Sequence, residues 1–591
     1  MLKKFFARAV LLLVSMLLFV PSFAKASWDD PTKPGWDDEE ARRGWIQNKI
    51  QHMTVKEKVG QLFMIHVYGQ TTTDPNYEDI NLGQNRGVKN FKEAIEKYHI
   101  GGIIYFNWTA NIGTPIDFEQ VNALSNGLQD IAMDQRMPIP LMIATDQEGG
   151  VVARVTEPAT VFPGNMALGA TRSTEYARQS SEIMGLELKS LGINMDLAPV
   201  LDVNMNPDNP VIGVRSFSEN PDLVAAMGAA QVTGYQNENV MATAKHFPGH
   251  GDTDVDSHYG LPIINHDLET LHEVDLKPFK AAIDTGIDAI MPAHIVVPAL
   301  DDSGLPATLS KPILTDLLRK EMGFDGVIIT DSLGMSGANV VPPDRVPVEA
   351  FIAGADILLN PPNVPLAYNA VLDAVKSGEI SRKRLDQSVF RILELKFKRG
   401  LFHEPNVPED AIENIGLEEN LELADQMTED SLTLVKNDDV LPLDTEKDVF
   451  VTGPSIGNPS MLADLLSEKG YSANAYATGT SPTSSQIANA VQHAADVDTV
   501  IVTAYSANLN NAQQRLVNDL METGKEVIVA SMRNPYDIIA FPDVHANVLT
   551  YGYRDVSVKA LAKVIAGEVN PTGKLPVTIP DLYDYGHGLS Y

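Results

Sequence analysis

The chain has 591 residues, of which 44% are hydrophobic, so it is long enough for two to four domains with sizeable cores and is not globally disordered. Its formal net charge is −33, and because such a surface repels nucleic acid and anionic membranes, neither is an expected partner. The absence of cysteine excludes disulfides, thiolate metal sites, cysteine nucleophiles and a lipid-modified N-terminal cysteine.

The N-terminus predicts a secretory signal peptide over residues 1–26. Three basic residues precede an apolar stretch at 9–20, and an A-x-A cleavage pattern ends at Ala26. An apolar stretch of about a dozen residues is short for a bilayer span. We therefore expect an exported chain that is cleaved before Ser27 and keeps no stable membrane anchor.

Residues 27–400 alternate short apolar segments with stretches in which apolar residues recur at helical spacing, for example 118–134, 175–191, 222–237 and 269–285. Residues 366–399 are also expected to be helical. Eight alternations of strand and helix predict a (β/α)8 barrel. The eight expected strands are 61–67, 102–106, 141–145, 193–198, 241–244, 289–293, 327–330 and 355–359.

Polar residues stand close to or just past the carboxyl ends of six of these expected strands. In such barrels the active site lies at the carboxyl ends of the strands. One acid at a strand end is usually a turn or capping residue, but six polar positions at matching places indicate a site. They are Asp146, Asp196, Lys245 with His246, His294, Asp331 and Asn360.

The stretch 245–258 reads KHFPGHGDTDVDSH and contains three histidines and three aspartates. Its proline and glycines exclude a helix, so the first two histidines do not form the i,i+4 pair of a helical zinc site. The aspartates imitate the start of a calcium loop, but Ser257 replaces the required glycine and Ile263 the final glutamate. We expect no metal and no cofactor. A purely structural polar loop is the alternative, and the number of ionisable groups argues against it.

Residues 401–427 are rich in Glu, Asn and Pro with weak periodicity, and we interpret them as a linker on the surface. A second α/β pattern over 428–591 predicts an open sandwich rather than another barrel. Within it, 453–457 matches the G-x-S-x-G pattern of serine hydrolases, although a tight turn after a strand satisfies so short a motif equally well. The expected strands are 449–452, 473–477, 499–504, 526–531, 547–551 and 575–579.

The run KHFPGHG at 245–251, followed by the Asp-Ser-His element at 256–258, resembles glycoside hydrolase family 3, and within it the β-N-acetylglucosaminidases. The stretches 431–443, 570–577 and 585–591 resemble the second domain of that family. The resemblance therefore covers nearly all of the mature chain. It implies an α/β architecture in which a (β/α)8 TIM-type barrel is followed by an α/β/α sandwich.

Glycoside hydrolysis usually needs two groups, an acid and a nucleophile or base. Asp331, within GVIITDSLGM at 326–335, resembles the catalytic aspartate of the family and is the expected nucleophile of a covalent glycosyl-enzyme. In the resembled subgroup the Asp-Ser-His element supplies the acid, which implies His258 as acid/base and Asp256 as its partner. An imidazole exchanges protons near neutrality, so the chemistry is reasonable. The alternatives are that Asp331 only caps a helix and that His258 only binds substrate.

Four further residues are expected to bind the sugar. Asp146, in DQEGG at 146–150, resembles the substrate-binding aspartate of the family, and Arg215 resembles its binding arginine. Lys245 and His246 complete the match. The chain departs from the pattern after Gly150, where two valines replace the expected Arg-Val, and this departure concerns the outer subsites.

We therefore expect a secreted, retaining exo-β-N-acetylglucosaminidase, a β-N-acetylhexosaminidase. Its expected substrates are small N-acetylglucosaminides, in particular cell-wall muropeptides, and it is expected to act as a monomer in the cell wall or periplasm. One alternative is a β-N-acetylglucosaminide phosphorylase, since a neutral histidine does not repel phosphate as a carboxylate would. Another is a family 3 β-glucosidase with a second-domain glutamate as acid. A non-catalytic sugar-binding protein and a metal-dependent hydrolase are the remaining alternatives.

Overall fold

The computed structural model describes residues 38–591, so the predicted signal peptide over 1–26 lies outside the described residues. Helix α2 (Glu39–His52) belongs to one compact unit, and Met53–Tyr591 form another. Within the described part of the chain, no helix is long and apolar enough to cross a membrane.

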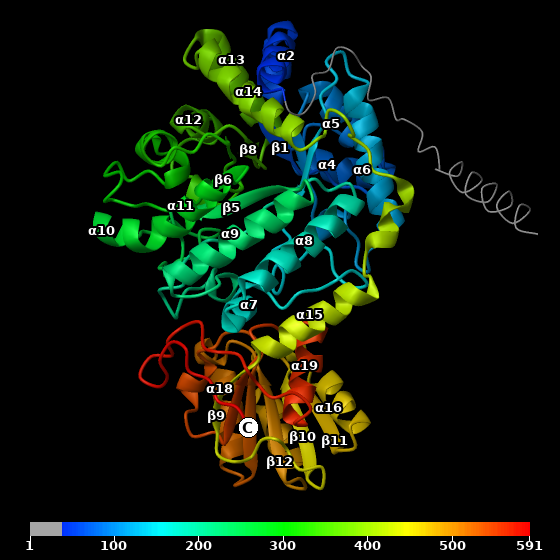
Figure 1. Ribbon diagram of the computed structural model, residues 1–591, viewed down its shortest axis with the longest axis vertical. Helices are drawn as coiled ribbons and strands as arrows, with labels where there is room; N and C mark the ends of the chain where they lie inside the picture. Colours follow the sequence, from blue (N-terminus) through cyan, green and yellow to red (C-terminus); the bar gives the residue numbers. More distant parts are fainter. Residues whose placement is uncertain (1–37) are drawn as a thin grey trace, which may run out of the picture. The chain divides into compact units, whose positions relative to one another are not determined.

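Eight parallel strands form the barrel that the sequence predicts (Figure 1). They are β1 (Phe63–Ile65), β2 (Gly102–Ile104), β3 (Met142–Thr145), β4 (Met195–Asp196), β5 (Met241–Phe247), β6 (Ala289–Pro292), β7 (Val327–Ile328) and β8 (Leu358–Leu359). Neighbours follow the chain order from β1 to β7, and β8 pairs with β1. A parallel bridge between Ile329 and Ile357 joins β7 to β8 and closes the ring. Every strand residue is buried, as expected for a parallel sheet covered by helices.

Helices cover the outside of the barrel. The α-helices are α3 (Val55–Gly60), α4 (Glu78–Gly83), α5 (Phe91–Tyr98), α6 (Phe118–Met133), α7 (Asn165–Thr171), α8 (Thr174–Ser190), α9 (Pro221–Asn237), α10 (Leu268–Thr270), α11 (Leu276–Thr285), α12 (Arg345–Ala353), α13 (Val364–Ser377) and α14 (Arg382–Lys398). Between β6 and β7 the helix is a π-helix (Pro312–Glu321). The side chains of Asp117, Ser173 and Asn220 accept hydrogen bonds from the free N–H groups at the starts of α6, α8 and α9. The helix expected over 366–399 is divided, because Gly378 at φ 87° ends α13 and Ser381 caps α14.

The segment expected as a linker, 401–427, is partly helical. It contains a 3-10 helix (Glu409–Asn414) and the larger part of α15 (Glu418–Ser431). The buried carboxylate of Glu187 accepts the Gly416 N–H at 2.9 Å, which fastens the segment to the barrel. Helix α15 escaped detection because its apolar positions are few in an acid-rich stretch.

The second domain is an open six-stranded sheet in the order β11-β10-β12-β13-β14-β9, parallel except for β9 (Figure 1). The strands are β9 (Thr433–Asn437), β10 (Asp448–Pro454), β11 (Ser472–Thr478), β12 (Thr499–Ala504), β13 (Glu526–Ser531) and β14 (Ala546–Leu549). The helices are α16 (Pro459–Glu468), α17 (Ser484–Ala494), α18 (Asn511–Met521) and α19 (Asp555–Ile565). Alternate strand residues form two cores. One packs against α16 and α19, and the other against α17 and α18, which confirms the α/β/α sandwich.

Two details of the second domain differ from the prediction. The expected strand at 575–579 is not a strand, because Pro576 and Pro580 flank Val577–Ile579 and cannot donate to a ladder. The sixth strand is instead β9, which pairs antiparallel with β14 at the edge of the sheet. The G-x-S-x-G match is a turn: Ser455, which is exposed, begins a 3-10 helix (Ser455–Gly457) between β10 and α16.

The barrel and the second domain share a buried apolar cluster. Met166 and Val214 from the barrel pack with Tyr536, Tyr551 and other apolar residues of the second domain. Polar bonds reinforce this contact, for example the 2.9 Å bond from Asn204 Nδ2 to the Tyr536 hydroxyl.

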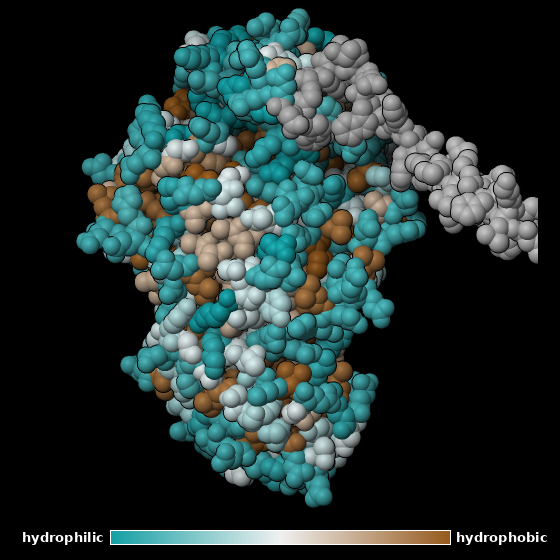
Figure 2. Space-filling model, in the orientation of Figure 1, coloured by the Kyte–Doolittle hydropathy of each residue, from teal (hydrophilic) through white to brown (hydrophobic). Residues whose placement is uncertain are grey.

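The face drawn in Figure 2 is mostly hydrophilic, with apolar residues scattered over it, in keeping with the acidic composition.

Candidate active site

A cavity of about 320 Å³ lies at the carboxyl ends of the barrel strands. Residues at or just after the ends of β2 to β8 line it, as expected for the functional face of a barrel. Every lining residue among those described lies between 104 and 360, so the second domain contributes none of them. The lining includes three carboxylates, Asp146, Glu148 and Asp331.

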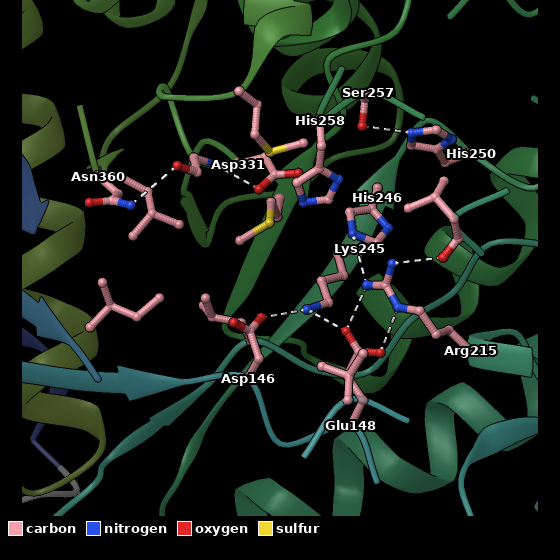
Figure 3. Close-up of a pocket in the computed structure, with 18 of the residues that line it drawn as sticks. Asp146, Glu148, Arg215, Lys245, His246, His250, Ser257, His258, Asp331 and Asn360 are labelled. Carbon is pink, nitrogen blue, oxygen red and sulfur yellow. Dashed lines mark hydrogen bonds and ion pairs between the residues drawn. The ribbon is translucent and has the colours of Figure 1, made fainter. Parts of the chain in front are cut away.

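Four charged side chains form the floor of the cavity (Figure 3). Lys245 Nζ lies 2.9 Å from Asp146 Oδ1 and 2.8 Å from Glu148 Oε1. Arg215 donates to both oxygens of Glu148, from Nε at 2.9 Å and from Nη2 at 2.7 Å. Burial alone would raise the pKa of Glu148, but Arg215 and Lys245 outweigh it and hold that pKa far below the usual carboxyl value. The floor is thus a set of two positive and two negative charges, fixed by their mutual contacts.

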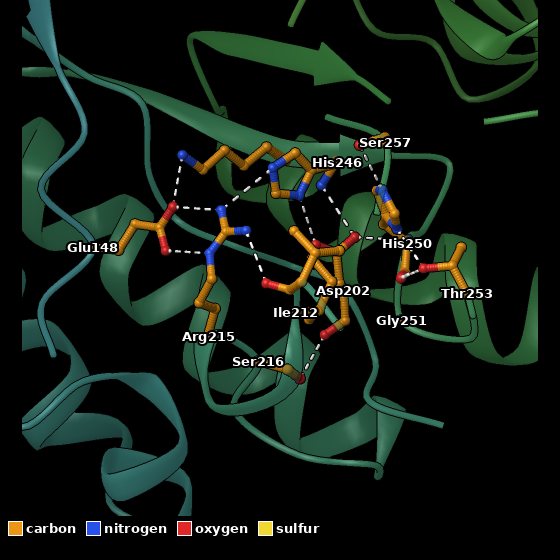
Figure 4. A network of polar contacts seen from close by, with 12 residues as sticks. Glu148, Asp202, Ile212, Arg215, Ser216, His246, His250, Gly251, Thr253 and Ser257 are labelled. Carbon is orange, nitrogen blue, oxygen red and sulfur yellow. Dashed lines mark hydrogen bonds and ion pairs between the residues drawn. The ribbon is translucent and has the colours of Figure 1, made fainter. Parts of the chain in front are cut away.

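Asp202, which is fully buried, holds the start of the 245–258 loop (Figure 4). Its Oδ1 accepts the His246 N–H at 3.2 Å and the His250 N–H at 2.8 Å. Its Oδ2 lies 2.7 Å from His246 Nδ1, which assigns the proton to that nitrogen. The Nε2 atom of His246 therefore remains an acceptor, 3.5 Å from Arg215 Nη2 and beside the cavity.

His250 connects the two ends of the same loop. Its ring nitrogens contact the hydroxyls of Thr253, at 2.7 Å, and Ser257, at 3.0 Å. Burial lowers the pKa of His250 to about 4, so this histidine is neutral at neutral pH and acts as a connector. The loop is also tied to the segment after β7, where the Gly337 N–H donates to the Ser257 carbonyl at 3.1 Å. A Cβ at Gly337 would lie 2.8 Å from the His294 side chain, so this approach requires glycine.

His258 projects into the cavity from this loop (Figure 3). Its Nδ1 lies 2.7 Å from Asp256 Oδ1, and the same oxygen accepts the His258 backbone N–H at 2.9 Å. The carboxylate assigns the proton to Nδ1 and leaves Nε2 for the cavity. About half of the His258 side chain is exposed, so protons exchange readily with solvent.

Asp331 stands three residues beyond the end of β7, and its carboxylate faces the cavity. Its Oδ1 accepts the Ser332 N–H at 2.6 Å. Burial would raise the pKa of Asp331, but positive charge on His294, His246 and Lys245, with the Ser332 N–H, holds it below the usual value. Burial also lowers the pKa of His294, whereas the Ser332 N–H and the Lys245 ammonium keep their effect on Asp331 at neutral pH.

The structure brings six of the seven predicted site residues to one cavity: Asp146, Arg215, Lys245, His246, His258 and Asp331. Asp256 does not line the cavity and stands behind His258 as its hydrogen-bond partner. Two other strand-end residues are fully buried outside the lining. Asp196 accepts the Gln147 N–H, and the ring nitrogens of His294 lie within hydrogen-bonding distance of the Thr308 hydroxyl and the Ser332 carbonyl.

Sequence reasoning missed Glu148, Asp202, Arg154 and Trp108. Glu148 lies two residues after Asp146 in the same motif, and Asp202 interrupts an apolar run, so both carried a weak signal. Two of the three aspartates that imitate a calcium loop pair with histidines: Asp252 with His266 at 2.8 Å and Asp256 with His258 at 2.7 Å. Over residues 38–591, no group of three or more acidic or histidine side chains is arranged to hold a metal ion.

A barrel with this site, followed by an α/β sandwich, is the architecture of a two-domain glycoside hydrolase. The model of the Glycosyl hydrolase family 3 N terminal domain matches residues 54–395, and the model of its C-terminal domain matches residues 432–591. The chain belongs to glycosyl hydrolase family 3, as the sequence resemblance implied.

Individual relatives share most of the chain. Beta-hexosaminidase A of Pseudoalteromonas piscicida is 34% identical over 89% of this chain and 97% of its own length. The Beta-N-acetylglucosaminidase/beta-glucosidase of Cellulomonas fimi is 30% identical over 90% and 95%. The solved structure of a family 3 β-N-acetylglucosaminidase from Paenibacillus sp. str. FPU-7 superimposes with a TM-score of 0.82, at 38% identity over 89% of this chain and 99% of that one.

Proposed function

We propose that this glycoside hydrolase is a retaining, exo-acting β-N-acetylglucosaminidase. The observation that carries the proposal is the pairing, in one cavity, of the Asp331 carboxyl group with a His258 whose Nδ1 is held by Asp256. No residue of the second domain lines the described cavity, which argues against a β-glucosidase whose acid is a second-domain glutamate. The names of the relatives support the N-acetylglucosaminide as substrate.

In the first step, an Asp331 oxygen attacks the anomeric carbon as the bond to the leaving oxygen breaks. The protonated Nε2 of His258 gives its proton to that oxygen, and a neutral alcohol departs. In the second step, the neutral His258 takes a proton from water, whose oxygen attacks the anomeric carbon and releases Asp331. Two displacements at one carbon retain its configuration. Asp256 stabilises the imidazolium that forms when the Nε2 atom of His258 is also protonated.

The floor of the cavity supports recognition of a terminal sugar. Asp146 and His246 offer acceptors for sugar hydroxyls, and Lys245 and Arg215 offer donors, all in fixed positions. A cavity of about 320 Å³ is small for a ligand site, which suits one sugar ring rather than the interior of a chain. We propose on this basis that the enzyme removes single residues from chain ends.

We further propose that the enzyme acts after export, on cell-wall fragments. The signal-peptide pattern over residues 1–26 supports export. N-terminal sequencing of the exported protein tests this proposal and should begin at Ser27. A chain that starts at Met1 and stays in the cytoplasm would contradict it.

The proposed activity is tested with nitrophenyl β-glycosides, with and without phosphate and a chelator. We expect the N-acetylglucosaminide to be cleaved far better than the glucoside, with N-acetylglucosamine as product and no effect of chelator. Phosphate-dependent release of a sugar 1-phosphate would establish the phosphorylase, and equal cleavage of the glucoside would establish the β-glucosidase. Loss of activity with chelator would point to a metal-dependent hydrolase, and binding without cleavage to a sugar-binding protein.

A further inference from the structure

We propose that Trp108 is the platform of an aglycone subsite that takes the pyranose ring of a second sugar across the scissile bond. This inference deepens the proposed function and rests on it. Trp108 lines the same cavity as Asp331 and His258, yet 58% of its surface is exposed. The charged floor, which we propose holds the terminal sugar, is largely buried, whereas Trp108 is exposed at the rim. The part of the substrate that extends from the floor to the rim is the leaving group, so Trp108 lies where the leaving group is expected.

The indole is held in place from behind. It stacks on Phe106, with ring centroids 4.1 Å apart and planes inclined by 17°. Phe106 is itself buried, so the stack is anchored in the barrel wall. The backbone turn that carries Trp108 is fixed as well, since Asn107 Nδ2 donates to the Arg154 carbonyl at 3.0 Å.

The outer face of the indole is open. The Arg154 guanidinium lies 5.0 Å from the Trp108 ring centre and 5.9 Å from that of Phe106. The ring centres of Trp108 and Phe106 and the Arg154 guanidinium form a triangle, and its angle at Trp108 is nearly a right angle. Arg154 therefore lies beside the stack, at its edge. The face opposite Phe106 therefore accounts for the exposure of the residue.

A large, rigid and exposed aromatic face beside a polar cavity suits a carbohydrate ring. The axial C–H groups of a β-linked pyranose form an apolar face that packs on an aromatic surface, while the hydroxyls point outward to water or polar side chains. Arg154, at the edge of the indole, offers donors for such hydroxyls. Val151, which stands where an arginine is expected, packs against the interdomain apolar cluster and offers the outer subsites no donor.

The test compares three β-N-acetylglucosaminides: N,N′-diacetylchitobiose, the nitrophenyl glycoside and the methyl glycoside, which has no aglycone ring. For Trp108→Ala, we expect kcat/KM on the disaccharide to fall on the order of ten-fold more than on the methyl glycoside. Trp108→Phe should recover most of the difference. Tyr259→Ala is the matched control, because that ring is 85% exposed, follows His258 and does not line the cavity.

Binding gives a second readout that does not depend on turnover. In Asp331→Asn, the disaccharide should change the fluorescence of Trp108, and N-acetylglucosamine alone should change it much less. Equal losses on all three substrates in Trp108→Ala, or a selective loss also in Tyr259→Ala, would overturn the platform. If the unaltered protein cleaves none of the three substrates, the proposed function fails instead, and the fluorescence titration still decides the platform.

Discussion

The buried charges beneath the cavity give a quantitative prediction, because Glu148 has two cationic partners and almost no contact with solvent. Replacement Glu148→Gln keeps the shape of the side chain but removes its charge. It also turns an amide N–H₂ toward the donors of Arg215 or Lys245. Removing one partner of a buried charge pair costs about 3–5 kcal/mol, because the remaining charge stays buried without compensation.

The expected loss lies at the lower end of that range. Lys245 keeps Asp146 at 2.9 Å, and Arg215 keeps a hydrogen bond to the Val211 carbonyl at 3.2 Å. We therefore expect Glu148→Gln to lower the free energy of unfolding by about 3 kcal/mol, measured by urea unfolding followed by circular dichroism. The substitution also disturbs the floor of the cavity, where we propose that the terminal sugar binds, so KM for the N-acetylglucosaminide should rise.

The dependence on pH has a definite sign. The pKa of Glu148 is held below its unfolded value, so its contribution is fully present above about pH 4.3 and is lost as the pH falls further. The difference from wild type should therefore stay constant from neutral pH down to about pH 5.

The matched control is Glu175→Gln, in an ion pair with Arg178 on the surface of α8. Its unfolding midpoint should stay close to that of the wild-type protein, because exposed ion pairs contribute little. A double variant with Arg215→Gln should cost less than the sum of the single variants. A Glu148→Gln midpoint equal to that of the control, or additive losses in the double variant, would refute the reasoning.

Three further predictions concern the loop, its support and the second domain. His258→Ala should slow hydrolysis of a disaccharide far more than glycosylation of the enzyme by a nitrophenyl glycoside, and azide should restore turnover. If both substrates are slowed equally and azide has no effect, another residue is the acid. The hydrogen bond to Asp275, with a further one to Asp252, outweighs burial and raises the pKa of His266 to about 9. Protonated His266 therefore stabilises the fold fully below about pH 6.5, and this contribution is lost as the pH rises through 9. The stability gap between wild type and His266→Gln should narrow over that window, and a constant gap in urea titrations would contradict it. Arg554 Nε donates to the Gly150 carbonyl at 3.0 Å, so Arg554→Ala should raise KM about two- to ten-fold with less effect on kcat, and an unchanged KM would show that the second domain does not position the DQEGG segment.

Much of the fold could be predicted because buried parallel strands leave continuous apolar runs. Seven of the eight barrel strands fall within the predicted runs, whereas β5 continues past its run 241–244 to Phe247 and includes Lys245 and His246. The strand ends then located Asp146, Lys245 and Asp331 without any knowledge of their neighbours. The failures have physical causes. An apolar alternation such as 575–579 resembles a strand wherever burial is strong, and only the flanking prolines showed otherwise.

Buried charges were harder to predict than strand ends. A carboxylate such as Glu148 resembles a surface acid in sequence, because its partners come from distant segments, the turn after β4 and the strand β5. The same holds for Asp202, whose role as an acceptor for His246 and His250 depends on the segment after β4 lying beside β5 and the loop that follows it. The proposed role of Trp108 rests on its stacking on Phe106, which no spacing in the sequence records.

The central claim is a covalent intermediate on Asp331, and trapping it is the most direct test. A 5-fluoro-N-acetylglucosaminyl fluoride reacts quickly and is released slowly, so the glycosyl-enzyme should accumulate. Mass spectrometry of the digested protein should find one sugar on the peptide that contains Asp331, and none in Asp331→Ala. Inactivation with the label on another residue, or turnover without any labelled peptide, would contradict the account.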